Sequence, residues 1–231
     1  MALNLKKRDL RKYDIEVFVD ISRSMLAKDT SSGKSRLDDC REKVGVLVEE
    51  CEKIDTDGVT FGFFNGKVTT YENTTFAKVG PLFAKTYPDG GTATALVLEE
   101  RIGDYFDKRF GKPKSGLFGK AVPADPKTKP RIIVIFTDGE PNVPDERSAR
   151  KAVVKVIVDA TKRLKQEGLT KDALAICFIQ TGRDSGAKVF LTELDNDLEP
   201  AGAVMDIVKC LTVEHVDGLS THALLEAALD G

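Results

Sequence analysis

The sequence has little histidine and little cysteine, which limits the metal and redox chemistry that it can support. Its 231 residues include two histidines, His215 and His222, both near the C-terminal end, so we do not expect a histidine-based metal site. The cysteines lie far apart and form no C-x-x-C pair, a pattern typical of reduced, buried cysteines rather than of a disulfide framework or a metal site. They stand at Cys40, Cys51, Cys177 and Cys210.

An excess of charge of one sign is also missing, and so are long apolar runs. The formal net charge is −2, so no overall field favours nucleic acid or an anionic membrane. No stretch approaches the roughly 18 apolar residues of a membrane span. The first residues, MALNLKKRDLRKYD, lack the apolar run of a secretory signal. We therefore expect a soluble cytoplasmic protein that binds neither nucleic acid nor membrane.

Strand and helix patterns alternate along the chain. Strands are expected at 14–22, 131–142, 173–179 and 206–213, and helices at 36–54, 94–110, 145–167, 186–195 and 219–229. Between the first two helices, VTFGFFNGKVTTY predicts a hairpin with a two-residue turn of positive φ at Asn65-Gly66. This order predicts one α/β domain over 1–231, with a Rossmann-like, doubly wound, mostly parallel six-stranded sheet, one antiparallel edge hairpin and helices on both faces. Residues 1–13 are an N-terminal extension.

Polar residues stand where three segments reach the sheet edge that binds ligands in such folds. Asp20, Ser22 and Ser24 alternate after the first strand, Thr92 precedes a helix, and Asp138 follows the fourth strand. If the backbone stays extended, the alternation puts the first three side chains on one side. Carboxylates and hydroxyls, without sulfur or imidazole, suit a hard divalent cation such as Mg²⁺ or Mn²⁺. The sequence thus predicts an oxygen-only metal site.

The motifs DISRSM, GGT and TDG, in this order, resemble the metal-ion-dependent adhesion site of von Willebrand factor type A domains. The resemblance covers nearly the whole chain and implies that Ser22, Ser24 and Thr92 bind Mg²⁺ (or Mn²⁺/Ca²⁺) through their hydroxyls. It also implies that Asp20 and Asp138 hold water on the ion or, in another state, coordinate it directly. A protein partner's Asp or Glu would complete the coordination, which makes the chain a recognition module and not an enzyme.

Two details of the resemblance concern its sub-family and one departure from the pattern. The C-terminal segments GRDSGAKVFLTELDNDL and DGLSTHALLEAAL also look like the domains of bacterial tellurium-resistance proteins of the TerF or TerY kind, which implies a stress-response setting. Arg23 stands where many relatives have glycine. Its guanidinium either weakens the ion electrostatically or binds the same partner carboxylate.

Other readings of the sequence remain open. A hard cation between carboxylates also suits a metal-dependent phosphohydrolase, although no histidine lies near the motifs. Gly33-Lys34-Ser35 resembles part of a phosphate-binding loop, which would make the chain a nucleotide-binding protein. That motif needs glycine at the position of Lys28, however, so a flexible loop with Ser35 as helix cap is the better interpretation for this segment. Residues 111–130 form a long basic loop, which we interpret mainly as a solvated, mobile segment, whereas Leu117 and Phe118 within it suggest a docking role. A purely structural domain with a vestigial site is the third class.

Overall fold

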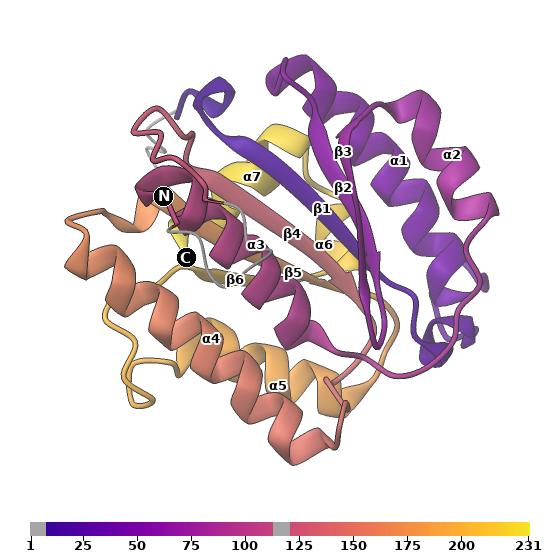
Figure 1. Cartoon of the computed structure of the whole chain (residues 1–231). Helices are drawn as coiled ribbons and strands as arrows, with labels where there is room; N and C mark the ends of the chain where they lie inside the picture. Colours follow the sequence, from indigo (N-terminus) through magenta and orange to yellow (C-terminus); the bar gives the residue numbers. More distant parts are fainter. Residues whose placement is uncertain (1–7, 113–120) are drawn as a thin grey trace, which may run out of the picture.

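The computed structural model describes residues 8–112 and 121–231. Within them, six strands form one sheet in the order β3-β2-β1-β4-β5-β6 (Figure 1). The strands are β1 (Asp14–Asp20), β2 (Val59–Phe64), β3 (Val68–Thr74), β4 (Arg131–Thr137), β5 (Leu174–Gln180) and β6 (Val208–Thr212). Five of them run parallel, and β3 pairs antiparallel with β2 at one edge. The predicted fold class is confirmed.

Helices cover both faces of the sheet. They are α1 (Arg36–Ile54), α2 (Phe76–Ala84), α3 (Thr94–Phe110), α4 (Glu146–Gln166), α5 (Ser185–Asn196), α6 (Val213–Val216) and α7 (Thr221–Asp230). In Figure 1, α3, α4 and α5 lie in front of the sheet, α6 and α7 lie behind it, and α2 lies beside α1. The sheet is therefore the middle layer of a three-layer α/β domain.

Each central strand is buried on both faces, which explains its continuous run of apolar residues. In β1, Val17 and Val19 pack in the core shared with α1 and α7, whereas Phe18 packs in the core shared with α3 and α4. The same alternation runs through β4. Leu10 and Tyr13, from the segment predicted as an extension, are buried in the α1–α7 core as well. Part of that segment therefore packs against the domain.

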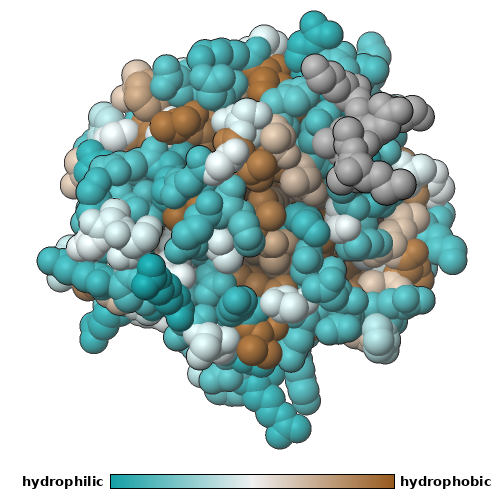
Figure 2. Space-filling model, turned by 180° about the vertical axis from the view of Figure 1, so that it is seen from behind, coloured by the Kyte–Doolittle hydropathy of each residue, from teal (hydrophilic) through white to brown (hydrophobic). Residues whose placement is uncertain are grey.

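The face opposite to the view of Figure 1 shows apolar side chains gathered in a band along its middle (Figure 2). A hollow of about 250 Å³ lies between α1 and the C-terminal helices, where Val46, Leu47, Val216 and Leu224 line it. Phe76, the first residue of α2, is exposed as well. None of the helices in the described part of the chain is long and apolar enough to cross a membrane.

The hairpin turn differs from the prediction. The loop between β2 and β3 has three residues, 65–67, because Phe64 pairs with Val68, and neither Asn65 nor Gly66 has a positive φ. The Asn65 side chain accepts a hydrogen bond from Lys67 N at 3.2 Å and donates one to Asp89 O at 2.9 Å. This tertiary contact determines the shape of the turn.

The long loop before β4 is held where the structure describes it. Lys112 and Val122 form an isolated antiparallel bridge with two backbone hydrogen bonds of 2.8 and 2.9 Å. Asp125 N also donates to Lys108 O at 2.9 Å, so the C-terminal part of the loop is attached to α3. Leu117 and Phe118, for which the sequence suggested a docking role, lie outside the described residues.

Candidate metal centre

The candidate site lies at the carboxyl ends of β1 and β4. These two parallel neighbours occupy the middle of the sheet, and the chain continues from β1 to β2 on one side but from β4 to β5 on the other. The strand order therefore reverses between them, which is where open α/β sheets bind their ligands. Asp20 is the last residue of β1, and Asp138 directly follows β4.

The backbone does not stay extended as far as Ser24, contrary to the expectation from the sequence. Strand β1 ends at Asp20, and Arg23–Leu26 forms a short 3-10 turn. This turn still brings the two serines together, because the Oγ atoms of Ser22 and Ser24 lie 3.0 Å apart. The predicted clustering of the hydroxyls is therefore correct, but a tight turn produces it rather than strand alternation.

Hydrogen bonds join four of the five predicted ligands into one cluster. Ser24 Oγ donates to Oδ1 of Asp138 at 3.0 Å, and Ser22 Oγ contacts Ser24 Oγ. Asp20 accepts from Ser22 N at Oδ1 (2.7 Å) and from Thr137 Oγ1 at Oδ2 (2.8 Å). Asp20, Ser22 and Asp138 are buried, whereas Ser24 is exposed. The cluster is open to solvent on the side of Ser24.

The loop that carries Thr92 is attached to the loop that carries the serines. Asp89 N donates to Ile21 O at 2.9 Å, and Arg23 N donates to Gly90 O at 3.2 Å. These two backbone bonds hold the segment before α3 against the segment after β1. Thr92 is thus on a loop adjacent to the other four residues, as the sequence predicted.

Two asparagines fix the position of the Thr92 loop. Asn142 accepts from Thr92 N at 2.9 Å through its side chain and donates its own N–H to Thr92 O at 3.0 Å. A Cβ at Gly91 would lie 2.4 Å from Asn142 Oδ1, so only glycine allows this close approach. Asn65 supports the loop from the hairpin, where its backbone oxygen accepts from Ala93 N at 2.9 Å.

The hydroxyl of Thr92 is a buried polar atom without a hydrogen-bond partner among the described residues. The residue is 1% exposed, so water does not satisfy the hydroxyl from a free surface. An unsatisfied buried hydroxyl costs about 1–3 kcal/mol. Such a group, in a loop next to a cluster of carboxylates and hydroxyls, is a candidate ligand for a cation.

Burial and mutual repulsion make the two carboxylates difficult to ionise together. Burial and the nearby Asp138 carboxylate together raise the pKa of Asp20 to about 7, against the hydrogen bonds from Ser22 and Thr137. Burial also raises the pKa of Asp138, whereas the guanidinium of Arg36 and the hydroxyl of Ser24 act in the opposite direction. A divalent cation between the two groups would favour their charged forms.

Several residues of the site were not identified from the sequence. Thr137 bonds to Asp20, Asn142 and Asn65 hold the Thr92 loop, and Arg36 donates from Nη1 to Asp138 Oδ2 at 2.7 Å. Thr137 stands inside the TDG motif, so that motif already contained it. Nothing local marks Arg36, because it resembles any polar residue in the first turn of a helix.

The predicted helix cap is confirmed. Ser35 is the N-cap of α1, and its Oγ accepts from Asp38 N at 3.1 Å. Lys34 forms an ion pair with Glu42 on α1, and its backbone oxygen accepts from Thr30 Oγ1 at 2.8 Å. The segment that resembles part of a phosphate-binding loop thus has its own local contacts.

Arg23 lies on the rim of the site. Its side chain is 78% exposed, and Nη2 lies 3.1 Å from Oδ1 of Asp89, which is exposed as well. The guanidinium therefore points toward the Thr92 loop and solvent, and its charge is partly offset by Asp89.

Two other acidic groups lie at the opposite edge of the sheet. Asp14, Asp55 and Asp57 have carboxylate oxygens within 4.8 Å of one another, but Lys129 Nζ already contacts all three, at 3.0 Å from Asp55 Oδ1 and 3.6 Å from Asp14 Oδ1. We interpret them as an ion-pair cluster, because the ammonium contacts all three carboxylates and offsets part of their charge.

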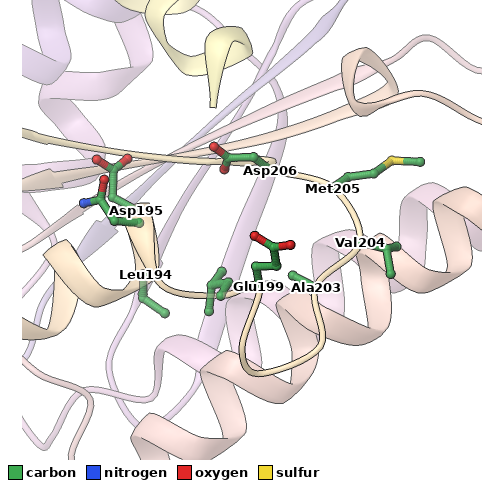
Figure 3. A pocket seen from close by; sticks show the side chains of 9 residues that line it. Leu194, Asp195, Glu199, Ala203, Val204, Met205 and Asp206 are labelled. Atoms are coloured by element: carbon green, nitrogen blue, oxygen red, sulfur yellow. The ribbon is translucent and has the colours of Figure 1, made fainter.

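The second group surrounds a hollow of about 290 Å³ between the end of α5 and the start of β6 (Figure 3). Asp195 accepts from Cys210 N at 3.0 Å and lies 3.5 Å from Lys209 Nζ. Asp206 Oδ1 accepts from Val208 N at 3.4 Å. Both carboxylates accept hydrogen bonds from the backbone of β6, at the end of the sheet opposite to Asp20.

Comparisons with known proteins find similarity in structure but not in sequence. No family model and no curated protein matches the chain. The PilB minor pilin from Streptococcus sanguinis has a TM-score of 0.57 at 13% identity, over 94% of this chain and 60% of the pilin. The manganese-loaded Plasmodium vivax TRAP protein has a TM-score of 0.52 at 15% identity, over 93% of this chain and 74% of TRAP. The fold is von Willebrand factor type A-like.

A third solved structure, the pilus adhesin SpaC from Lactobacillus rhamnosus GG, has a TM-score of 0.51 at 14% identity, over 94% of this chain and 29% of the adhesin. The chain therefore spans less than two thirds of the length of the pilin and a smaller share of this adhesin. At these identities the likeness concerns the fold. The Thr92 hydroxyl, which has no partner among the described residues, and the neighbouring carboxylates and hydroxyls are oxygen donors of the kind that a divalent cation binds.

Proposed function

We propose that the chain is a divalent-cation-dependent recognition module that binds a protein partner through an Asp or Glu of that partner. The observation that carries the proposal is the buried, unpartnered Oγ1 of Thr92, on a loop attached to the serine loop. The manganese-loaded TRAP protein supports a divalent cation in this fold. Mg²⁺ is the ion we expect, and Mn²⁺ or Ca²⁺ suits the same oxygen donors.

In this proposal, the five residues divide the work between neutral and charged oxygens. Ser22, Ser24 and Thr92 would hold the cation through hydroxyls, and Asp20 and Asp138 would supply the negative charge that attracts it. A bound cation would provide a Lewis-acidic centre for a carboxylate from outside. The partner would approach on the side of Ser24, because Ser24 is exposed whereas the other four side chains are buried.

We favour binding over phosphohydrolysis because the charged groups of the cluster are already engaged. Asp20 and Asp138 each accept two hydrogen bonds, and the nearby Asp29 is bound by Arg36, so none of the three is positioned as a free general base. Turnover of p-nitrophenyl phosphate in Mg²⁺, lost in Asp20→Asn, would contradict this part of the proposal.

The cellular setting belongs to the same proposal. The four cysteines are free thiols, and three of them are buried, which supports a reducing compartment such as the cytoplasm. The resemblance of the C-terminal segments to tellurium-resistance proteins suggests a stress response. Deletion of the gene should then sensitise the source organism to tellurite, and unchanged growth on tellurite would remove this setting.

The binding function can be tested with a defined probe. A library of random 12-residue peptides is selected on the immobilised chain in Mn²⁺ and eluted with EDTA. We expect the enriched peptides to share one Asp or Glu whose replacement by Asn or Gln abolishes binding. Ser22→Ala and Thr92→Val, which each remove one hydroxyl, should also abolish it. Binding that survives EDTA, or that needs no acidic residue, would overturn the proposal.

A further inference from the structure

Arg36 forms a buried bridge between the candidate site and the loop before α1. It is the first residue of α1, and its side chain is 9% exposed. Nη1 donates to Asp138 Oδ2 at 2.7 Å. Nε and Nη2 donate to the two oxygens of Asp29 at 2.7 and 2.6 Å, which is the bidentate geometry of a strong guanidinium–carboxylate pair.

The surrounding backbone is shaped around this guanidinium. Gly182 has φ of 77°, and a Cβ there would lie 2.3 Å from Arg36 Nε, so the loop after β5 packs directly against the planar group. Arg183 N also donates to Asp29 Oδ2, at 3.3 Å. The position of Arg36 is therefore fixed from three sides by α1, the Asp29 loop and the loop after β5.

The bridge makes the two site carboxylates unequal. Both oxygens of Asp138 accept hydrogen bonds from the protein. Oδ2 accepts from the positively charged guanidinium of Arg36, and Oδ1 accepts from Ser24 Oγ. Asp20 accepts from neutral donors only, Ser22 N and Thr137 Oγ1. Direct coordination of an ion by Asp138 Oδ2 would leave the Nη1 donor of Arg36 without its partner inside the protein, and an unsatisfied buried donor is costly even though Asp29 still pairs with the guanidinium. No equivalent cost applies to Asp20.

We propose that Arg36 is a positioning residue that keeps Asp138 out of direct contact with the cation. This inference rests on the proposed function, because it requires a cation at the five residues. With Asp138 held back, a coordination position remains available to the partner carboxylate without a rearrangement of the site. The positive charge of Arg36 also repels the cation, so Arg36 lowers the affinity of the site for the ion while it keeps a coordination position open for the partner.

The test measures Mn²⁺ bound to the purified chain. Electron paramagnetic resonance gives the affinity from the free Mn²⁺ signal, and water-proton relaxation gives the number of water molecules bound to the ion. Arg36→Gln keeps a hydrogen-bond donor but removes the charge. We expect it to bind Mn²⁺ about tenfold more tightly, given one unit charge removed close to a divalent ion, and with fewer bound waters. Arg36→Lys, which keeps the charge, should retain the wild-type water number.

A second variant protects the test against misfolding. Asp29→Asn weakens the ion pair that holds Arg36 from the side away from Asp138, and the Asp29 side chain is 37% exposed. This variant should shift the Mn²⁺ affinity and the number of bound waters in the same direction as Arg36→Gln, but by less. Thermal melts in chelator establish that each variant folds. Unchanged water number in both variants would overturn the inference while leaving the proposed function intact. Absence of Mn²⁺ binding by the wild type would overturn both.

Discussion

Thr137 Oγ1 donates a hydrogen bond to Oδ2 of Asp20 at 2.8 Å, across 117 residues of sequence and between two adjacent strands. Both residues are buried, so solvent does not replace the bond when it is lost. Thr137→Val should therefore weaken Mg²⁺ binding by about ten- to a hundredfold, since hydrogen bonds to charged groups contribute about 1.5–3 kcal/mol. Thr137→Ser should bind like the wild type. Isothermal calorimetry measures both, and equal affinities in the Val and Ser variants would contradict this role.

The second prediction uses the unpartnered hydroxyl of Thr92. Thr92→Val keeps the shape of the side chain but removes the hydroxyl, so the ion-free protein should be as stable as the wild type or up to about 1 kcal/mol more stable. The same change should abolish most of the stabilisation by Mg²⁺, because it removes an oxygen ligand. Urea unfolding in chelator and in Mg²⁺ separates the two effects. Loss of stability in chelator would show that the hydroxyl has a structural partner.

The third prediction concerns pH. Burial raises the pKa of Asp20 to about 7 in the ion-free chain, from about 3.9 in an unfolded chain. The folded state then binds the extra proton between these values, so Asp20 stabilises the fold below pH 4 and loses this contribution as the pH rises through 7. Asp138, whose pKa burial also raises, has the same sign.

A divalent cation needs the deprotonated carboxylates, so its stabilising effect should have the opposite dependence. The shift in melting temperature between Mg²⁺ and chelator should grow steadily from pH 5 to pH 8. Asp20→Asn should flatten the ion-free curve over the same range and remove the shift. A shift in Mg²⁺ that is independent of pH would exclude these carboxylates as the binding groups.

The fourth prediction separates the two interpretations of Arg23. Its side chain is mostly exposed and paired with Asp89, so its field at the ion is screened by water and salt. Arg23→Ala should change Mg²⁺ affinity by about twofold or less. It should weaken binding of the selected acidic peptides more than it weakens ion binding. A large gain in Mg²⁺ affinity would instead favour direct electrostatic opposition to the ion.

The fifth prediction concerns a buried charge network in the core. Arg101 donates to both oxygens of Glu16, at 2.8 and 2.9 Å, and Arg131 Nε lies 3.0 Å from the same carboxylate. Glu16→Ala leaves two buried guanidinium groups short of a partner and should lower the free energy of unfolding by about 3–5 kcal/mol. The exposed pair of Lys155 and Asp159 is the control, for which Lys155→Ala should cost less than about 0.5 kcal/mol.

The sequence was sufficient for the fold because its central strands are buried on both faces. A run such as 132–136, which is entirely apolar and is followed by TDG at 137–139, has few alternatives once helical patterns flank it. Helix α2 was not predicted, and the hairpin turn was predicted wrongly. The turn follows the contact of Asn65 with Asp89, which is 24 residues away, and no local propensity contains that contact.

The five candidate ligands came from spacing, but their supporting residues did not. Thr137 and Arg36 reach Asp20 and Asp138 across 117 and 102 residues. The role of such a hydroxyl or guanidinium can be identified only once the strands are aligned, because the residues next to it in sequence do not indicate which carboxylate it will bind. The 3-10 turn after Asp20 is similar, since the backbone bonds from the Thr92 loop to Ile21 and Arg23 help to determine it.

The bond from Ser24 to Asp138 closes a loop of 114 residues. The oxygen cluster therefore forms only after β1 and β4 have paired, and loop closures of this length are late and slow events in folding. Any stabilisation that depends on the complete cluster is absent from an early transition state. A bound ion should consequently lengthen the lifetime of the folded chain by slowing its unfolding, and leave its rate of folding almost unchanged.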